Sequence, residues 1–161
     1  MITVIFFDLY GTLAGFSPSR YEIQSEACAD FGIEVTPEGV LRGYALADAH
    51  MAAQNAVRPL RQLDEAERDR FFAEYEGLVL RGDGHDIDGE KAGEIWRRVR
   101  QVRYGLARFD DVLPTMDLLK MQGLTLGLIS NLNRDGNRLA ESLGLTPYLD
   151  FTVTSLEVGA E

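Results

Sequence analysis

The spacing of apolar residues changes twice along the chain and divides the sequence into three segments. Residues 2–7, ITVIFF, form a continuous apolar run rich in β-branched and aromatic side chains, which is typical of a strand buried on both faces. From Ser17 to Gly105 the apolar positions follow helical spacing instead. After Asp111 helical and strand patterns alternate.

The middle segment predicts a small bundle of helices and no strand. The helices are expected to begin at capping residues or Pro pairs: Ser17-Pro18, Thr36-Pro37, Asp64 and Asp88. The first, third and fourth are expected to end near Gly32, Gly82 and Gly105. The second is expected to bury one apolar stripe: Val40, Leu41, Tyr44, Ala45, Ala49 and Ala52.

The last segment predicts alternating helices and strands. Residues 112–123 (VLPTMDLLKMQG) and 134–145 (RDGNRLAESLGL) have helical patterns, and 124–131 (LTLGLISN) and 150–155 (DFTVTS) have strand patterns. Strands that alternate with helices pair in parallel through right-handed crossovers. We therefore predict an α/β fold. A Rossmann-like parallel-sheet core is expected from residues 1–16 and 106–161, with an α-helical domain, residues 17–105, inserted after the first strand.

Each predicted strand ends in polar residues. Asp8 ends the first strand, Ser130 and Asn131 end the second, and Ser155 ends the third. In open α/β sheets ligands bind at the carboxyl ends of the strands, so these side chains are expected at one edge.

An aspartate in that position can act as a preorganised nucleophile that forms a covalent ester or acyl-phosphate. Gly11 permits a tight turn after Asp8, and Thr12 offers a hydroxyl and a backbone N–H to an anion. Asn131 and Ser130 can donate further hydrogen bonds. Taken alone, Asp8 would be interpreted as a strand-end cap, but the combination favours a catalytic site.

These residues resemble a known family. DLYGTL at 8–13 and LISN at 128–131 resemble the first two motifs of the haloacid dehalogenase superfamily of hydrolases, and residues 112–131 and 143–161 are also similar to it. The helical segment lies where that family inserts its cap domain. The resemblance implies a hydrolase in which Asp8 attacks a small anionic organic substrate and forms a covalent aspartyl intermediate.

Tyr10 is informative within this resemblance. Most phosphatases of the superfamily carry a second aspartate at this place, and a phenol with a reference pKa of about 10 replaces that acid poorly. The family's L-2-haloacid dehalogenases carry tyrosine there, and their halide leaving group needs no proton. The resemblance therefore favours carbon–halogen hydrolysis of a 2-haloacid without a cofactor, with Arg42 as a candidate substrate-binding arginine. A purely packing role for Tyr10 stays open.

Two alternatives remain. A magnesium-dependent phosphatase would bind Mg²⁺ through the Asp8 carboxylate and the backbone carbonyl of Tyr10. A non-catalytic or incomplete chain is the other, because the family's third-motif lysine and its fourth-motif acidic pair have no match here. Neither Lys91 in the helical segment nor Lys120 on a core helix replaces that lysine. We expect the natural gene to continue with Lys-Pro and further α/β units.

Composition narrows the expected partners. Acidic residues outnumber basic residues by 26 to 16, a net charge of −10, so nucleic acid and anionic membranes are not expected to bind. No apolar run approaches the roughly 20 residues of a membrane span, and the N-terminus lacks the features of a signal peptide. The single cysteine, Cys28, is expected to be a packed helical thiol in a cytoplasmic protein. An uncovered sheet edge would allow a homodimer.

Overall fold

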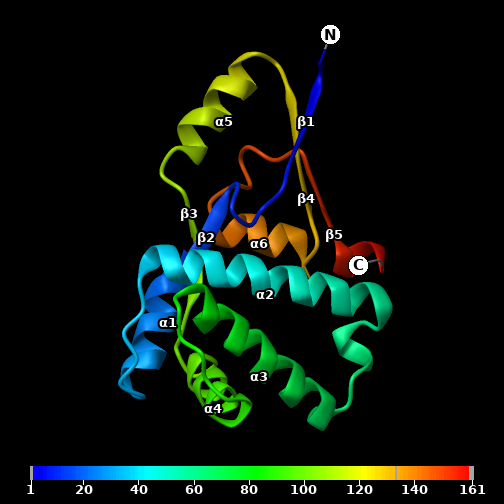
Figure 1. The fold of residues 1–161 in the computed structure, drawn as a ribbon. Coiled ribbons are helices and arrows are strands. Elements are labelled where there is room, and N and C mark those ends of the chain that lie inside the picture. Colours follow the sequence, from blue (N-terminus) through cyan, green and yellow to red (C-terminus); the bar gives the residue numbers. More distant parts are fainter. Residues whose placement is uncertain (1, 133, 160–161) are drawn as a thin grey trace. The chain divides into compact units, whose positions relative to one another are not determined.

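The computed structural model describes residues 2–132 and 134–159 and divides into two compact units. One unit combines Met1–Ser17 with Gly105–Glu161, and we call it the α/β unit. The other, Pro18–Tyr104, is the helical unit. Figure 1 shows the chain entering the helical unit after its first two strands and returning to the α/β unit through β3.

The α/β unit contains the parallel sheet that the sequence predicts. Its strand order is β1-β4-β5, with bounds β1 Val4–Phe7, β4 Thr125–Ser130 and β5 Phe151–Thr154. Both neighbouring pairs are parallel, with Phe7 opposite Leu128 and Ser130 opposite Thr154. The intervening helices are α5, Val112–Met121, and α6, Gly136–Ser142, and a short α7, Ser155–Val158, follows β5. The predicted α/β fold class is confirmed.

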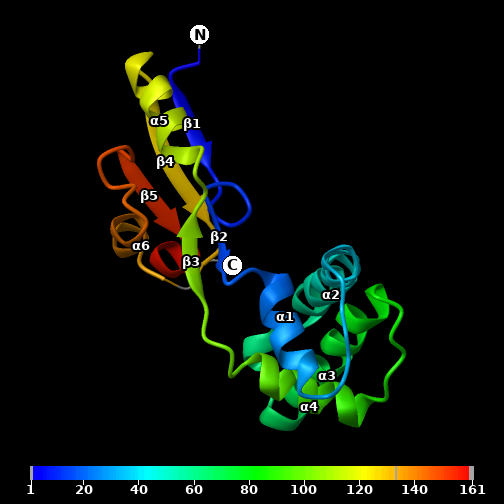
Figure 2. The same cartoon turned by 90° about the vertical axis from the view of Figure 1, so that its left-hand side faces the viewer.

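Helices α5 and α6 both pack on one face of this sheet (Figure 2). Leu126 and Leu128 of β4 are fully buried and share a core cluster with residues of both helices: Val112, Met116, Leu139 and Ala140. Alternate residues of a strand point to opposite faces, so Leu126 and Leu128 lie on the same face. Burial of these side chains stabilises the unit by about 1.5–3 kcal/mol for each large apolar residue.

The opposite face of the sheet corrects one expectation. Residues 2–7 were expected to form a strand buried on both faces, but Val4 and Phe6 are 41% and 55% exposed, and Ile129 of β4 is 51% exposed. The Phe6 and Phe151 rings pack edge to face, 5.2 Å between centroids. The expectation was wrong because, within the described residues, both core helices lie on the Leu126 side.

A two-stranded antiparallel ribbon was not predicted. It pairs β2, Ala14–Ser17, with β3, Gly105–Arg108, so that Ala14 lies opposite Arg108. The Nη1 of Arg108 donates a hydrogen bond to the carbonyl of Leu143, 2.6 Å. These short segments carry no alternating apolar pattern, and their partners are far apart in the sequence. They become neighbours only because the chain returns to the α/β unit after the helical unit.

The helical unit contains helices close to those expected. Their bounds are α1 Arg20–Ala29, α2 Pro37–Val57, α3 Glu65–Gly82 and α4 Gly89–Val99, with a 3₁₀ turn, η1, at Leu60–Gln62. Thr36, Asp64 and Asp88 cap α2, α3 and α4 through their side chains, as predicted. None of the helices in the described residues is long and apolar enough to cross a membrane.

Two helix ends differ from the prediction. The first helix is capped by Ser19, which forms a capping box with Glu22, because Ser17 is instead the last residue of β2. The fourth helix ends at Val99 and does not reach Gly105, because Gly105 begins β3. In both places a residue that the local pattern assigned to a helix end, Ser17 or Gly105, instead pairs in the β2–β3 ribbon.

Helices α2 and α3 approach each other through glycines. A Cβ on Gly43 would lie 1.9 Å from the carbonyl oxygen of Val79, and one on Gly82 would lie 2.2 Å from the Gly43 nitrogen. Because of this contact, the buried face of α2 differs from the apolar stripe that was expected. Tyr44 is buried as predicted, but Leu41 is 74% exposed, since glycine positions form part of the contact face.

A cluster of polar side chains is buried inside the helical unit. Glu76 of α3 is fully buried and accepts a hydrogen bond from the Gln24 amide of α1, and the Tyr44 hydroxyl of α2 donates to Gln24 Oε1, 3.3 Å. Among the described residues, the second Glu76 oxygen has no hydrogen-bond partner. Burial raises the pKa of Glu76 to about 7, against the lowering effect of the Gln24 hydrogen bond. Cys28 is also fully buried, as expected, and burial raises its pKa to about 11.

Substitution of glycines on the two sides of the bundle should have opposite effects. Gly43→Ala should lower the free energy of unfolding of the helical unit by about 2 kcal/mol or more, because the added methyl overlaps backbone. Gly77→Ala, where a Cβ meets nothing within 4 Å, should raise it by up to about 1 kcal/mol. Urea unfolding followed by fluorescence of Trp96, the single tryptophan, measures both. Equal changes in the free energy of unfolding for Gly43→Ala and Gly77→Ala would contradict the close contact between α2 and α3.

The Glu76 carboxyl should make the stability of the helical unit depend on pH. Its folded pKa of about 7 exceeds the ordinary value of 4.5, so the folded state binds more protons between these pH values and stability falls as pH rises through them. The loss should reach about 3 kcal/mol above pH 7. Glu76→Gln should remove this pH dependence and stabilise the unit at pH 8. Exposed Glu94→Gln is the control, and the same slope in wild type and Glu76→Gln would contradict the assignment.

Candidate functional site

Asp8 and Ser130 meet where β1 and β4 end. Asp8 directly follows β1, Ser130 is the last residue of β4, and the two strands are parallel neighbours. The Ser130 hydroxyl donates a hydrogen bond to Asp8 Oδ1, 3.3 Å. Asp8 is exposed, whereas Ser130 is only 8% exposed. The carboxylate is therefore open to solvent while the α/β unit holds its hydroxyl partner.

The turn after Asp8 is fixed by its own backbone. The carbonyl of Leu9, a fully buried residue, accepts hydrogen bonds from the N–H groups of Thr12, Leu13 and Ala14 at 3.3, 2.8 and 3.0 Å. Gly11 has a φ of +80°, a left-handed conformation that side chains with a Cβ rarely adopt. The Thr12 N–H, which the sequence analysis assigned to the substrate, thus donates within the turn, while Thr12 itself is exposed.

Tyr10 lies beside the unpredicted ribbon. Its ring packs against the ring of Phe16 in β2, 4.8 Å between centroids at an interplanar angle of 51°, and its backbone bridges to Ala14. The side chain is 36% exposed. The ring is therefore held against the ribbon by its contact with Phe16.

Asn131 and Ser155 directly follow the last residues of β4 and β5. Asn131 is exposed and directly follows Ser130, so its chain position agrees with the expected edge. Ser155 does not end a strand, because β5 ends at Thr154 and Ser155 begins α7.

Glu157 is a residue that the sequence analysis missed. Its carboxylate accepts hydrogen bonds from the N–H groups of Gly136, 3.1 Å, and Thr154, 2.8 Å. It therefore ties the start of α6, which follows β4, to the end of β5. The spacing of Thr154 and Glu157 matches a capping box, and this signal could have identified it.

Arg42 and the lysines have other contacts. Arg42 belongs to the helical unit, where its Nε donates to the carbonyl of Gly82, 3.2 Å, so a role in substrate binding stays a prediction. Lys120 binds both oxygens of Asp150 at 2.9 and 2.7 Å, and Asp150 also accepts from the N–H of Leu126 near the start of β4. The Lys120 hydrogen bond lowers the Asp150 pKa. Lys120 thus lies at the edge opposite Asp8, in agreement with its exclusion from the site.

The described residues supply only part of a magnesium site. Mg²⁺ prefers oxygen ligands and is commonly held by one or two carboxylates together with water. The Asp8 carboxylate and the Tyr10 backbone carbonyl are donors of the right kind. However, no group of three or more His, Cys, Asp or Glu side chains within residues 2–132 and 134–159 is placed to hold a metal ion.

Comparison with known families agrees with the α/β fold. The model of the haloacid dehalogenase-like hydrolase family matches residues 2–161. The chain therefore belongs to the haloacid dehalogenase-like hydrolases.

Two solved structures, from Bacillus subtilis and Clostridium difficile, agree in fold. The HAD-hydrolase YfnB from Bacillus subtilis, solved with bound magnesium, is 16% identical, with a TM-score of 0.54 over 100% of this chain and 69% of its own. A protein from Clostridium difficile assigned as a phosphatase is 11% identical, with a TM-score of 0.50 over 99% and 63%. The L-2-haloacid dehalogenase RSc1362 is 18% identical, with a TM-score of 0.49 over 99% and 66%.

The chain covers only part of the length of the solved structures that it matches. A predicted phosphoglycolate phosphatase from Haemophilus somnus is covered over 62% of its length, and YfnB over 69%. The chain thus spans about two thirds of the solved structures that it matches. No curated protein matches the sequence closely enough to count as a relative.

Gly11 offers a test of the turn that carries Asp8. Gly11→Ala should destabilise the α/β unit by about 1–2 kcal/mol, because it places a Cβ in the left-handed region. Gly105→Ala is the matched control in the same unit, since its φ is not positive and its Cβ would meet nothing within 4 Å. Hydrogen exchange of the β4 amides measures the stability of the sheet. An equally large loss of sheet stability in Gly105→Ala would contradict the explanation by the left-handed conformation of Gly11.

Proposed function

We propose that the protein is a hydrolase in which Asp8 is the nucleophile that attacks a small anionic substrate. The observation that carries this proposal is the contact between the exposed Asp8 carboxylate and the Ser130 hydroxyl at the carboxyl edge of the sheet. A carboxylate held by one hydrogen bond keeps lone pairs free for attack on an electrophile. Membership of the hydrolase family supports this reading.

In the proposed first step an Asp8 oxygen forms a bond to the electrophilic atom of the substrate, and the leaving group departs with its bonding electron pair. Water then attacks the ester that results, which releases the product and a proton and restores the Asp8 carboxylate. Hydrogen bonds from the Ser130 hydroxyl and the Asn131 amide stabilise the negative charge that develops or departs. Thr12 contributes its hydroxyl to the same anion.

Tyr10 favours halide as the leaving group. A halide departs without a proton, whereas an alkoxide leaving group is assisted by an acid, and a phenol is a weak acid at neutral pH. The proposed reaction is therefore hydrolysis of a carbon–halogen bond in a small 2-haloacid, without a metal cofactor. The roles of Arg42 in substrate binding and of the helical unit as a cap remain predictions from the resemblance.

A magnesium-dependent phosphatase is the second candidate. It is favoured by the oxygen donors of Asp8 and Tyr10 and by the magnesium bound to the fold relative YfnB. Mg²⁺ would neutralise charge on a transferring phosphoryl group. Against it stands the finding that no group of three or more His, Cys, Asp or Glu side chains within the described residues is placed to hold a metal ion.

The two candidates separate in one experiment. The full-length natural protein is incubated with 2-chloropropionate and with p-nitrophenyl phosphate, each with and without Mg²⁺, while chloride and phosphate release are measured. We expect chloride release that is independent of Mg²⁺. Phosphate release that requires Mg²⁺ would establish the second candidate. No release from either substrate, with Asp8→Asn behaving identically, would support a non-catalytic or incomplete chain.

Variants test the assigned residues. Asp8→Asn should abolish turnover by at least about a thousandfold, because the amide is not a nucleophile of comparable strength. Ser130→Ala should lower kcat by about 10- to 100-fold, which corresponds to one hydrogen bond to a charged group. Ser142→Ala, whose hydroxyl donates to the Leu139 carbonyl of its own helix, is the control. Wild-type turnover by Asp8→Asn would contradict the proposal.

A further inference from the structure

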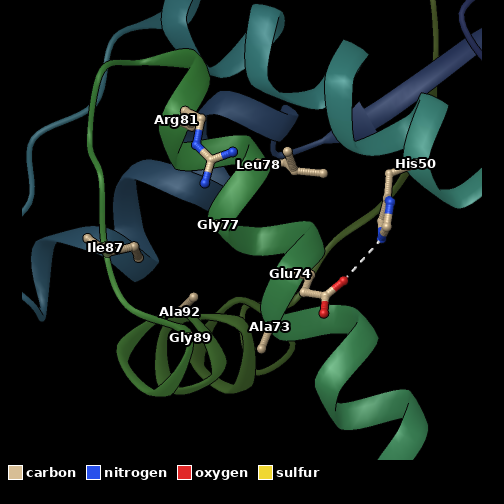
Figure 3. A pocket seen from close by; sticks show the side chains of 9 residues that line it. All are labelled: His50, Ala73, Glu74, Gly77, Leu78, Arg81, Ile87, Gly89 and Ala92. Carbon is tan, nitrogen blue, oxygen red and sulfur yellow. Dashed lines mark ion pairs between the residues drawn. The ribbon is translucent and has the colours of Figure 1, made fainter.

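A hollow in the helical unit is lined by none of the residues assigned to catalysis. It has a volume of about 350 Å³, within the range of small-molecule sites, and lies between α3, the start of α4 and His50 of α2 (Figure 3). Its wall on α3 is formed by one stripe of residues that includes Glu74, Gly77 and Arg81. Gly89 and Ala92 line it from α4. Every lining residue belongs to the helical unit.

Gly77 is the unusual residue of this hollow. A glycine inside a helix costs about 1 kcal/mol relative to alanine, and close packing commonly explains it. Close packing explains Gly43 and Gly82, where a Cβ would overlap backbone. At Gly77, in the interior of α3, a Cβ would meet nothing within 4 Å, and the same holds for Gly89 across the hollow. The missing side chains leave open volume in place of a helix–helix contact.

The two ends of the hollow carry opposite charges. Glu74 and Arg81 are seven positions apart on α3, about 10 Å along the helix axis, and Figure 3 shows both beside the hollow. At the Glu74 end, His50 Nε2 lies 3.6 Å from Glu74 Oε2, and the imidazole stacks on Phe71, 5.0 Å between centroids. At the other end, Arg81 Nη2 lies 4.0 Å from Oδ1 of the exposed Asp86.

The surface between the charged ends is apolar or without side chains. Leu78 and Ala73 of α3, Ile87 and Ala92 line it together with the two glycines. A ligand that fits this arrangement carries a cationic group for Glu74 and an anionic group for Arg81, joined by a short apolar body. A ligand with a single charge would interact favourably with only one of the two charged ends.

We propose that this hollow binds a small zwitterion, with its ammonium at Glu74 and its carboxylate at Arg81. The apolar body lies over Gly77 and against Ala92. This site is separate from the proposed chemistry at Asp8 and does not depend on it.

The test is a titration of the full chain with 6-aminohexanoate, a straight-chain zwitterion, monitored by amide shifts in ¹H–¹⁵N spectra. We expect saturable shifts at Gly77, Ile87 and Ala92 with a Kd of about 1 mM. Hexanoate and hexylammonium, which each carry one of the two charges, should bind at least about tenfold more weakly, a difference of about 1.4 kcal/mol. Equal binding of either singly charged probe would overturn the two-charge assignment.

Variants locate the binding site. Gly77→Phe should fill the open volume, and Arg81→Gln should remove the anion partner, so each should weaken binding at least about tenfold. Gly77→Ala, which adds only a methyl group, and Arg100→Gln, outside the hollow, are the matched controls and should bind as wild type. Shifts that do not saturate below about 50 mM, or that persist unchanged in Gly77→Phe, would overturn the proposal. The Trp96 fluorescence of each variant reports whether the helical unit has folded.

Discussion

The parallel pairing of β1 with β4 is the interaction on which the proposed site depends. It sets Phe7 opposite Leu128, so the residues that follow come to the same edge of the sheet. Asp8 and Ser130 are 122 positions apart in the sequence, and their hydrogen bond exists only because these strands are neighbours. β4 is the central strand and buries its last side chain, while Asp8 follows a strand at the sheet edge and stays exposed. The β1–β4 pairing thus places the buried Ser130 hydroxyl beside the exposed Asp8 carboxylate.

Glycine has two different effects in the helical unit. At Gly43 and Gly82 the missing side chain allows α2 and α3 to touch through their backbones, and a methyl group would separate them. At Gly77 the missing side chain leaves a hollow beside charged residues. Glu76, one residue earlier, points into the bundle and is fully buried. Helix α3 therefore has one face that packs tightly, with a buried carboxyl, and another that remains open.

Local patterns predicted most of the helices and strands because caps and apolar spacing are local signals. Thr36, Asp64 and Asp88 cap the helices that they were expected to cap, since each side chain accepts from a backbone N–H three residues later. The prediction failed for the β2–β3 ribbon, whose two strands lie on either side of the helical unit in the sequence. It also misplaced the contact face of α2, because a pattern of apolar side chains does not register a glycine contact.

The sequence by itself determined the α/β class, the inserted run of helices and the polar residues at the strand ends. These features can be recognised because apolar periodicity and the residue types that follow a strand are local properties of the chain. Only the tertiary structure decided that Ser130 contacts Asp8, that Glu157 joins the start of α6 to the end of β5, and that Lys120 lies at the opposite edge. It also decided that both core helices cover the same sheet face. These outcomes depend on which segments become neighbours, and that choice is made by packing between residues distant in the chain.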